Sequence, residues 1–328
     1  MPEETPDGAK QATPLWRTLL PWLIAAAILA YLFATIPVDK LADAFRQIAV
    51  WKLVVLSASF CFALLLADSL AMWVGFREAM PEKKLPITDV IEMRGATYLL
   101  AIVNYGVGQG GIVYFLHRYH GVRIAVSAGA VLLTSGAFVI VIALIVGTGM
   151  LAGAVPNRPE LKLLAVAVIA SLPVYLAIIA LKPRFLAQRA FCKPLFEPGV
   201  IGTLRVAAAR GVHAAVLVLG HWLAMQIFGI DVPLDSALAL IPVLLLVAAV
   251  PIAPSGLGTM QAAAITLFAQ YAPGDTEAIR NATVLAYSLS FHFISVGFIA
   301  LIGVVCLRQI NRRPIPEQED FDSPPETT

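Results

Sequence analysis

Two stretches of this sequence combine helix-breaking residues with polar side chains inside long apolar runs: residues 104–111 and residues 251–261. Proline lacks the backbone N–H and glycine is conformationally permissive, so we expect a helix to break in both stretches. Inside a membrane, such a break is tolerated only where protein or a water-filled cavity satisfies the freed backbone groups. Interruptions in both halves of a chain predict a binding site at the interface of two repeats, with ordinary loops between short spans as the alternative. The candidate binding residues in these stretches are Asn104, Gly108, Gln109, Gly110, Gly111, Pro251, Pro254, Ser255, Gly256, Gly258 and Gln261.

Three ionisable side chains lie within apolar segments: Asp68, Arg94 and Arg210. Ionisable groups in membrane segments are costly, face the protein interior and usually have a partner. We therefore expect Asp68 to pair with Arg94 or Arg210. A mutual structural pair and a contact with substrate are both compatible with the sequence.

Helix ends provide a second candidate binding feature. Helices that begin after Gly111 and Gly258 would direct unpaired N–H groups and the positive ends of their dipoles into the two gaps. This arrangement suits an anionic group such as a phosphate. Arg118 or Arg210 would supply the positive charge that attracts the anion.

The sequence contains no recognisable catalytic motif. The spacing of Gly106, Gly108 and Gly111 matches the dinucleotide-binding pattern, but that pattern needs a preceding strand and an acidic residue about 20 positions later. No Asp or Glu occurs between Glu92 and Glu160. The metalloprotease, nucleophile-elbow and P-loop patterns are also absent. We therefore expect neither an enzyme nor a bound cofactor.

The histidines and cysteines form no metal-binding pattern. The cysteines are scattered without a CxxC pair, which indicates neither a zinc site nor a disulfide framework. We expect no metal, and we interpret the two histidines beside Arg118 as interfacial residues. These side chains are His117, His120, His213, His221, His292, Cys61, Cys192 and Cys306.

The composition is that of a membrane protein. Hydrophobic residues make up 59% of the 328 positions and charged residues only 13%, with a mean hydropathy of +0.83. These values predict an all-α polytopic membrane protein. The formal net charge of +2 is spread along the ends of loops, so no nucleic-acid partner is expected.

Six apolar runs are long enough to cross a membrane, and two further runs contain the breaks. We expect six full spans plus two broken, re-entrant hairpins in an inverted repeat, forming one transmembrane domain over residues 15–307. Eight full spans are the alternative. Residues 1–14 and 308–328 are polar and are expected to be disordered cytoplasmic tails. The six full spans are 15–36, 51–76, 122–151, 161–181, 210–230 and 278–307, and the broken segments are 87–121 and 234–272.

The positions of lysine and arginine favour the hairpin arrangement. If each broken segment enters and leaves on one side, fifteen of the 23 basic residues lie on one side and six on the other, with Arg94 and Arg210 inside the hydrophobic segments. The side with more lysine and arginine residues is then cytoplasmic and holds both termini. The first hairpin enters from the cytoplasm and the second from outside, whereas eight spans would place Arg118 outside.

With these features the chain resembles the flippase-like family named after the transmembrane region of lysylphosphatidylglycerol synthase. The resemblance rests on the proline and glycine signature from Pro251 to Gly258 and on Asn104 with the glycines that follow it. The segment from His117 to Gly121 and the hydrophobic layout of nearly the whole chain also match.

Two positions depart from the family pattern, because Ser255 stands where a further glycine is usual and Gln261 stands where glutamate is common.

The resemblance implies translocation of a lipid or lipid-linked substrate across the bacterial inner membrane, and the helix ends suggest that this substrate is anionic. No soluble domain follows the last span, so synthase activity is not expected. The alternatives are an accessory or structural subunit of a lipid, hopanoid or glycolipid biosynthetic complex, and a membrane enzyme acting on a lipid head group. A homo-oligomer or a biosynthetic partner is compatible with either role.

Overall fold

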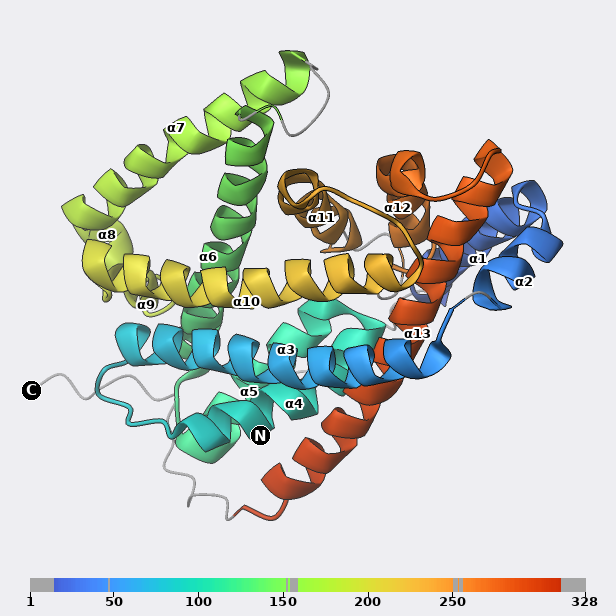
Figure 1. Cartoon of the computed structure of the whole chain (residues 1–328). Helices are drawn as coiled ribbons and strands as arrows, with labels where there is room; N and C mark the ends of the chain where they lie inside the picture. The colour runs from blue at the N-terminus through green and yellow to red at the C-terminus, as the bar shows by residue number, and fades with distance from the viewer. Residues whose placement is uncertain are drawn as a thin grey trace, which may run out of the picture.

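The computed structural model describes residues 15–46, 48–151, 153, 159–249, 253 and 256–313. In this part of the chain all regular structure is helical, which confirms the predicted all-α class (Figure 1). The second predicted tail, 308–328, is described as far as residue 313, and there α13 extends to Ile310 and Arg313 forms ion pairs, contrary to the expected disorder. The predicted tail at 1–14 and residues 314–328 lie outside the described residues. The helices are α1 (Leu15–Thr35), α2 (Val38–Arg46), α3 (Val50–Ala79), α4 (Ile87–Val103), α5 (Tyr105–His120), α6 (Ile124–Leu151), α7 (Pro159–Leu181), α8 (Arg184–Ala187), α9 (Lys193–Phe196), α10 (Gly199–Ile227), α11 (Leu234–Ala249), α12 (Thr259–Phe268), the 3-10 helix η2 (Ala269–Tyr271) and α13 (Glu277–Ile310).

Four helices within the described residues are long and apolar enough to cross a membrane: α3, α6, α10 and α13. A fifth span results if the apolar part of α1 is counted together with α2, to which it is bent by 91°. Helix α7 contributes a shorter apolar segment, Ile169–Leu181. These helices support a multi-pass membrane protein. The number of complete crossings, six, stays a prediction.

Helices α3 and α10 lie antiparallel and side by side (Figure 1). At one end, Arg205 near the start of α10 donates a 3.1 Å hydrogen bond to Glu78 near the end of α3. Along their length, Gly220 of α10 packs directly against the ring of Phe60 of α3. Residues three or four positions apart on a helix lie on the same face, so each helix packs against the other along its whole length. The pair therefore holds residues of α3 at fixed distances from residues of α10, although the two helices are far apart in sequence.

The buried apolar residues form two clusters, and α3 contributes to both. Leu64 belongs to the cluster that surrounds Tyr287 of α13. Met72 belongs to the cluster that surrounds Leu116 of α5. Asp68 lies on α3 one turn from each of these two residues, and it is only 2% exposed. A carboxylate therefore lies on the central helix between two apolar cores.

The first predicted break is much shorter than expected. Only Asn104 interrupts the helical backbone, with φ −158° and ψ 129°, and α5 begins at the next residue. The Asn104 side chain caps α5 by accepting hydrogen bonds from the backbone N–H groups of Gly106 and Val107, at 2.8 and 3.2 Å. The expectation that a helix would begin only after Gly111 was therefore wrong, because a single N-capping residue is enough to start a new helix.

The glycines after Asn104 serve close packing between α4 and α5. A Cβ on Gly108 would lie 2.8 Å from Ala101 Cβ, and one on Gly111 would lie 2.7 Å from Leu100 Cδ1. Gly110 faces open space. A helical glycine costs roughly 0.5–1 kcal/mol relative to alanine, and here the close approach of the two helices offsets part of that cost.

The second predicted break is present. Helix α11 ends at Ala249 and α12 begins at Thr259, directly after Gly258 as expected. Gly256 and Gly258 have φ values of +68° and +84°, which side chains with a Cβ rarely adopt. The candidate residues Pro251, Pro254 and Ser255 lie outside the described residues.

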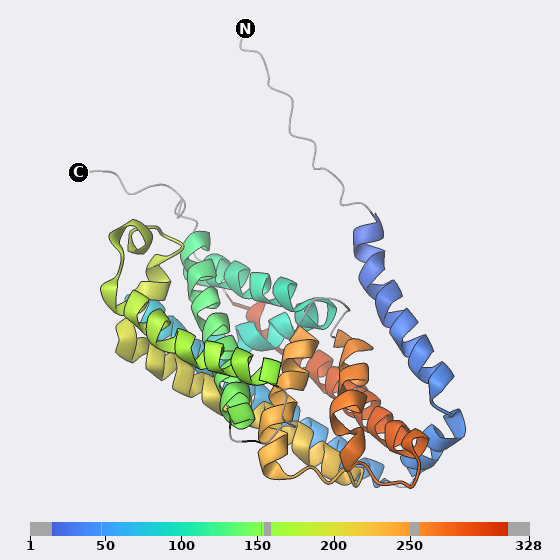
Figure 2. The ribbon, with the colours of Figure 1, turned by 90° about the horizontal axis from the view of Figure 1, so that it is seen from above.

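The two hairpins open toward opposite ends of the bundle. At one end, Lys83 before α4 donates a 3.4 Å hydrogen bond to the carbonyl of His120, the last residue of α5. At the other end, the backbone N–H of Asp231 before α11 donates a 3.1 Å hydrogen bond to the carbonyl of Tyr271. The 34-residue helix α13 runs between these ends, from the neighbourhood of η2 to that of α4. Figure 2 shows α1 standing to one side of this assembly.

Arg313, just after α13, ties the last long helix to the first hairpin. Its guanidinium lies 2.7 Å from Asp89 and 2.7 Å from Glu92, both on the first two turns of α4. The hydrogen bond to Glu92, reinforced by that to Asp89, raises the pKa of Arg313 above its usual value. Arg313 therefore stays charged over the whole working pH range.

Replacing Arg313 should loosen this attachment. We expect Arg313→Ala to lower stability by about 1–2 kcal/mol, since two charge-assisted hydrogen bonds at a partly exposed site are lost. Thermal unfolding in detergent measures the effect. The exposed neighbour Arg312 provides the matched control, and equal loss in Arg312→Ala would contradict a specific role for Arg313.

Candidate functional site

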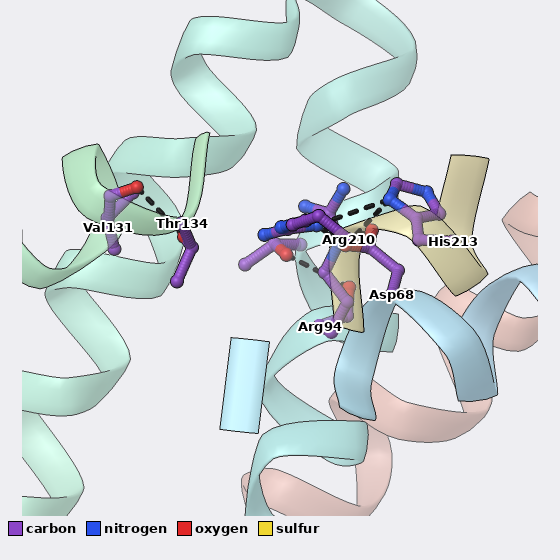
Figure 3. Close-up of polar contacts among 7 residues, drawn as sticks. Asp68, Arg94, Val131, Thr134, Arg210 and His213 are labelled. Carbon is purple, nitrogen blue, oxygen red and sulfur yellow. Dashed lines mark hydrogen bonds and ion pairs between the residues drawn. The ribbon is translucent and has the colours of Figure 1, made fainter. Parts of the chain in front are cut away.

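Asp68 binds both arginines that the sequence offered as alternative partners (Figure 3). Arg94 Nε of α4 lies 2.5 Å from Asp68 Oδ2, and an Arg210 terminal nitrogen of α10 lies 2.6 Å from Oδ1. All three side chains are buried. The prediction that Asp68 pairs with Arg94 or Arg210 is therefore confirmed, and the network joins three helices.

His213, one turn along α10 from Arg210, completes the polar cluster (Figure 3). Its Nδ1 lies 3.2 Å from the Arg210 nitrogen and 3.8 Å from Asp68 Oδ1. A guanidinium can only donate, so the shorter contact requires Nδ1 to accept. The proton of His213 is therefore on Nε2, and the ring is neutral.

The cluster carries more positive than negative charge. One carboxylate faces two guanidinium groups, which leaves a net charge of +1 with a neutral His213. One terminal nitrogen of Arg94 and the Nε of Arg210 are buried and have no hydrogen-bond partner among the described residues. A buried cation with a free N–H group is costly unless something else satisfies it.

A cavity of about 290 Å³ lies beside Arg94, between the tips of the two hairpins. Ala101, Ile102 and Tyr105 come from the tip of the first hairpin, and Ala248 and Met260 flank the break of the second. A cavity therefore lies between the two interruptions, but none of the candidate residues predicted from those interruptions that the structure describes lines it. Its other lining residues are Phe60, Leu64, Arg94, Tyr98, Leu217, His221, Leu245, Phe291, His292, Ser295, Val296 and Ile299.

Three residues of the cavity wall carry buried side-chain groups that can donate a hydrogen bond: Arg94, Tyr98 and Ser295. Arg94 and Tyr98 are one turn apart on α4, with the guanidinium carbon 4.9 Å from the centre of the Tyr98 ring. Each group can donate a hydrogen bond. Three donors beside an otherwise mostly apolar wall suit a ligand that combines an acceptor-rich head with a hydrophobic body.

Two histidines also line the cavity, His221 from α10 and His292 from α13. His221 Nδ1 lies 2.8 Å from the hydroxyl of the buried Tyr287, which fixes the orientation of its ring. The sequence showed no metal-binding pattern for these histidines and did not connect them with the breaks. Tyr98 and Ser295 were missed, although the spacing of Arg94 and Tyr98 on one helical face was a usable signal.

None of the predicted residues of the first break lines this cavity. Asn104 caps α5, while Gly108 and Gly111 pack against α4. None of the residues Gly108, Gln109, Gly110 and Gly111 lines the cavity, although the Gln109 side-chain oxygen is buried without a partner among the described residues. Arg118 is exposed near the opposite end of α5, so it does not supply the charge at this site.

Gln261 and Gly258 shape the second hairpin. Gln261 Oε1 accepts a 2.6 Å hydrogen bond from the backbone N–H of Gly258, which closes the start of α12. A Cβ on Gly258 would lie 3.1 Å from Ile28 Cβ and 3.2 Å from the carbonyl oxygen of Ala25, both on α1. Gly258 thus permits close contact with α1, and Gln261 acts here as a helix cap.

The charge imbalance of the cluster gives a stability prediction. Asp68→Ala leaves two buried guanidinium groups without a counter-charge, and we expect it to cost roughly 3–5 kcal/mol. Arg210→Met keeps the neutral pair of Asp68 and Arg94, so it should cost clearly less. Thermal unfolding of the two variants in detergent compares them, and an Arg210→Met protein as unstable as Asp68→Ala would contradict this account.

The comparisons with known proteins give one match. Searches of the curated proteins and of the solved structures found none. The family model described as the lysylphosphatidylglycerol synthase TM region matches residues 18–303, a range that contains both hairpins, the ion cluster and the cavity. The chain therefore belongs to the lysylphosphatidylglycerol synthase TM region family.

Proposed function

We propose that this protein moves a lipid or lipid-linked molecule with an anionic head group between the leaflets of the bacterial inner membrane. The head group binds in the cavity between the two hairpin tips, and the apolar remainder of the substrate lies along the cavity wall. Family membership supports a role in lipid handling. The proposal includes no chemical step, so the lipid leaves unchanged.

The observation that carries this proposal is the grouping of Arg94, Tyr98 and Ser295 on the wall of the cavity between the hairpin tips. Each of these side chains can donate a hydrogen bond, so together they suit a ligand rich in acceptors. Phosphate oxygens are acceptors, and Arg94 provides the charge that favours an anion over water. The lining residues between these donors are largely apolar, which suits acyl chains better than a soluble metabolite.

The opposed hairpins provide a route for the substrate from either surface. We propose that α1, α3, α6, α7, α10 and α13 cross the membrane, with both termini in the cytoplasm. Hairpin α4–α5 then enters from the cytoplasm and hairpin α11–α12 from outside, as an inverted repeat. Movement of one hairpin at a time would open the cavity to one side while the other tip closes it.

Single cysteines test this arrangement. In a protein whose Cys61, Cys192 and Cys306 are replaced, we expect Asp275→Cys to react with an impermeant thiol reagent added to intact cells. Arg118→Cys should react only after the cells are made permeable, because the open end of the first hairpin faces the cytoplasm. Labelling of Arg118→Cys in intact cells would instead favour the eight-span arrangement.

Removing a hydroxyl of the wall tests the substrate site. We expect Tyr98→Phe and Ser295→Ala each to slow lipid exchange by roughly tenfold, since a hydrogen bond to a charged group is worth about 1.5–3 kcal/mol. The unfolding temperature of both variants is measured as well, because the Tyr98 hydroxyl interacts with Arg94 and the Ser295 hydroxyl with Cys61, and slower exchange at an unchanged unfolding temperature assigns the hydroxyl to the substrate site. The assay uses purified protein in phosphatidylcholine vesicles containing a fluorescent phosphatidylglycerol, with exchange followed by chemical quenching of the outer leaflet.

Ser127→Ala is the matched control for this assay. The Ser127 hydroxyl is also buried, but it lies on α6 and does not line the cavity. Its removal should leave exchange unchanged. Normal exchange in both Tyr98→Phe and Ser295→Ala would remove the cavity from the substrate path.

A further inference from the structure

The fixed charge of the cavity is a single positive charge. Arg94 is the one Lys, Arg, Asp or Glu side chain among the described residues that line it. Behind Arg94, Asp68 neutralises one of the two guanidinium groups, and His213 is neutral because it accepts from Arg210. The cavity and its supporting cluster together therefore carry a charge of +1.

The remaining polar groups of the wall hydrogen-bond without changing this balance. The Tyr98 and Ser295 hydroxyls are neutral. Among the described lining residues, His221 and His292 have no carboxylate beside them that would hold a proton on the imidazole. The wall can therefore bind several acceptor atoms but compensates only one negative charge.

An uncompensated charge is expensive in this position. Arg94 is 6% exposed, and apolar side chains such as Phe60, Leu64 and Phe291 form much of the wall. Burying an unpaired ion costs several kcal/mol even after the surroundings relax. A ligand whose charge is not −1 leaves at least one such charge when it enters.

We infer that the cavity selects head groups with one negative charge, as in a phosphodiester, over doubly charged phosphomonoesters and over zwitterionic head groups. This selectivity rests on the proposed function. A phosphodiester monoanion balances Arg94 and uses the hydroxyls of Tyr98 and Ser295 as additional donors. A phosphomonoester dianion brings one charge too many, and a zwitterion brings a cation with no acidic partner among the lining residues.

Three lipids with the same labelled acyl chain test the inference on the unaltered protein. Phosphatidylglycerol carries one negative charge and phosphatidylcholine is zwitterionic. Phosphatidic acid is a phosphomonoester that takes a second negative charge in alkaline buffer, so the three are compared at about pH 9.5. We expect phosphatidylglycerol to exchange at least about tenfold faster than either of the others, which corresponds to about 1.4 kcal/mol. Equal rates for the three would overturn the charge selectivity and leave the proposed function standing. Absence of exchange for all three would reject the proposed function itself.

Changing the fixed charge should change the preference in a predictable direction. His292→Lys adds a positive charge to the wall, so the rate of phosphatidic acid relative to phosphatidylglycerol should rise about tenfold. His117→Lys adds the same charge outside the cavity and is the matched control.

Arg210→Met lowers the fixed charge to zero while keeping the pair of Asp68 and Arg94, so it should reduce the preference for phosphatidylglycerol over phosphatidylcholine. Unaltered rate ratios in both His292→Lys and Arg210→Met would overturn the inference even if wild type discriminates.

Discussion

The structure depends on the charge contacts of Asp68 with Arg94 and Arg210. They join α3, α4 and α10 at the level where the central helix passes from one apolar cluster to the other. Dispersion contacts within each cluster are non-directional, so they tolerate small rotations of a helix. The two short ion pairs do not tolerate such rotations, because a carboxylate with a guanidinium on each oxygen has little room to turn. The network therefore fixes the rotation of α4, and with it the direction of Arg94 and Tyr98.

Helix α4 connects three features that lie far apart in the bundle. Its first two turns bind Arg313 through Asp89 and Glu92. Its middle presents Arg94 to both Asp68 and the cavity, and its last turn contributes Ala101 and Ile102 to the hairpin tip. A helix of 17 residues is about 25 Å long and stiff, so displacement at one end moves the others. The end of α13 is thereby mechanically linked to the cavity wall.

The sequence predicted the features that follow from local chemistry or from the cost of burying charge. The helical class, the break before Thr259 and the pairing of Asp68 are of this kind. The glycine run after Asn104 was misjudged, because a glycine that permits a turn and a glycine that permits close helix packing look alike in sequence. The cavity donors Tyr98 and Ser295 are nearly 200 positions apart, and nothing local indicates that α4 and α13 bring them to the same wall. The same limit applies to Gln261, whose role as a cap depends on the backbone geometry of Gly258.

The sequence left open whether the buried charges form a structural pair or contact a substrate, and the stoichiometry of the cluster bears on that choice. A purely structural pair needs one cation for one carboxylate. Here the carboxylate holds two, and Arg94 also lines the cavity. Arg210 thus offsets much of the charge of Asp68, which leaves Arg94 oriented by the carboxylate without being neutralised by it. A fixed cation at the edge of an apolar cavity raises the energy of the empty state and lowers that of an anion-bound state, which is the difference that a binding site requires.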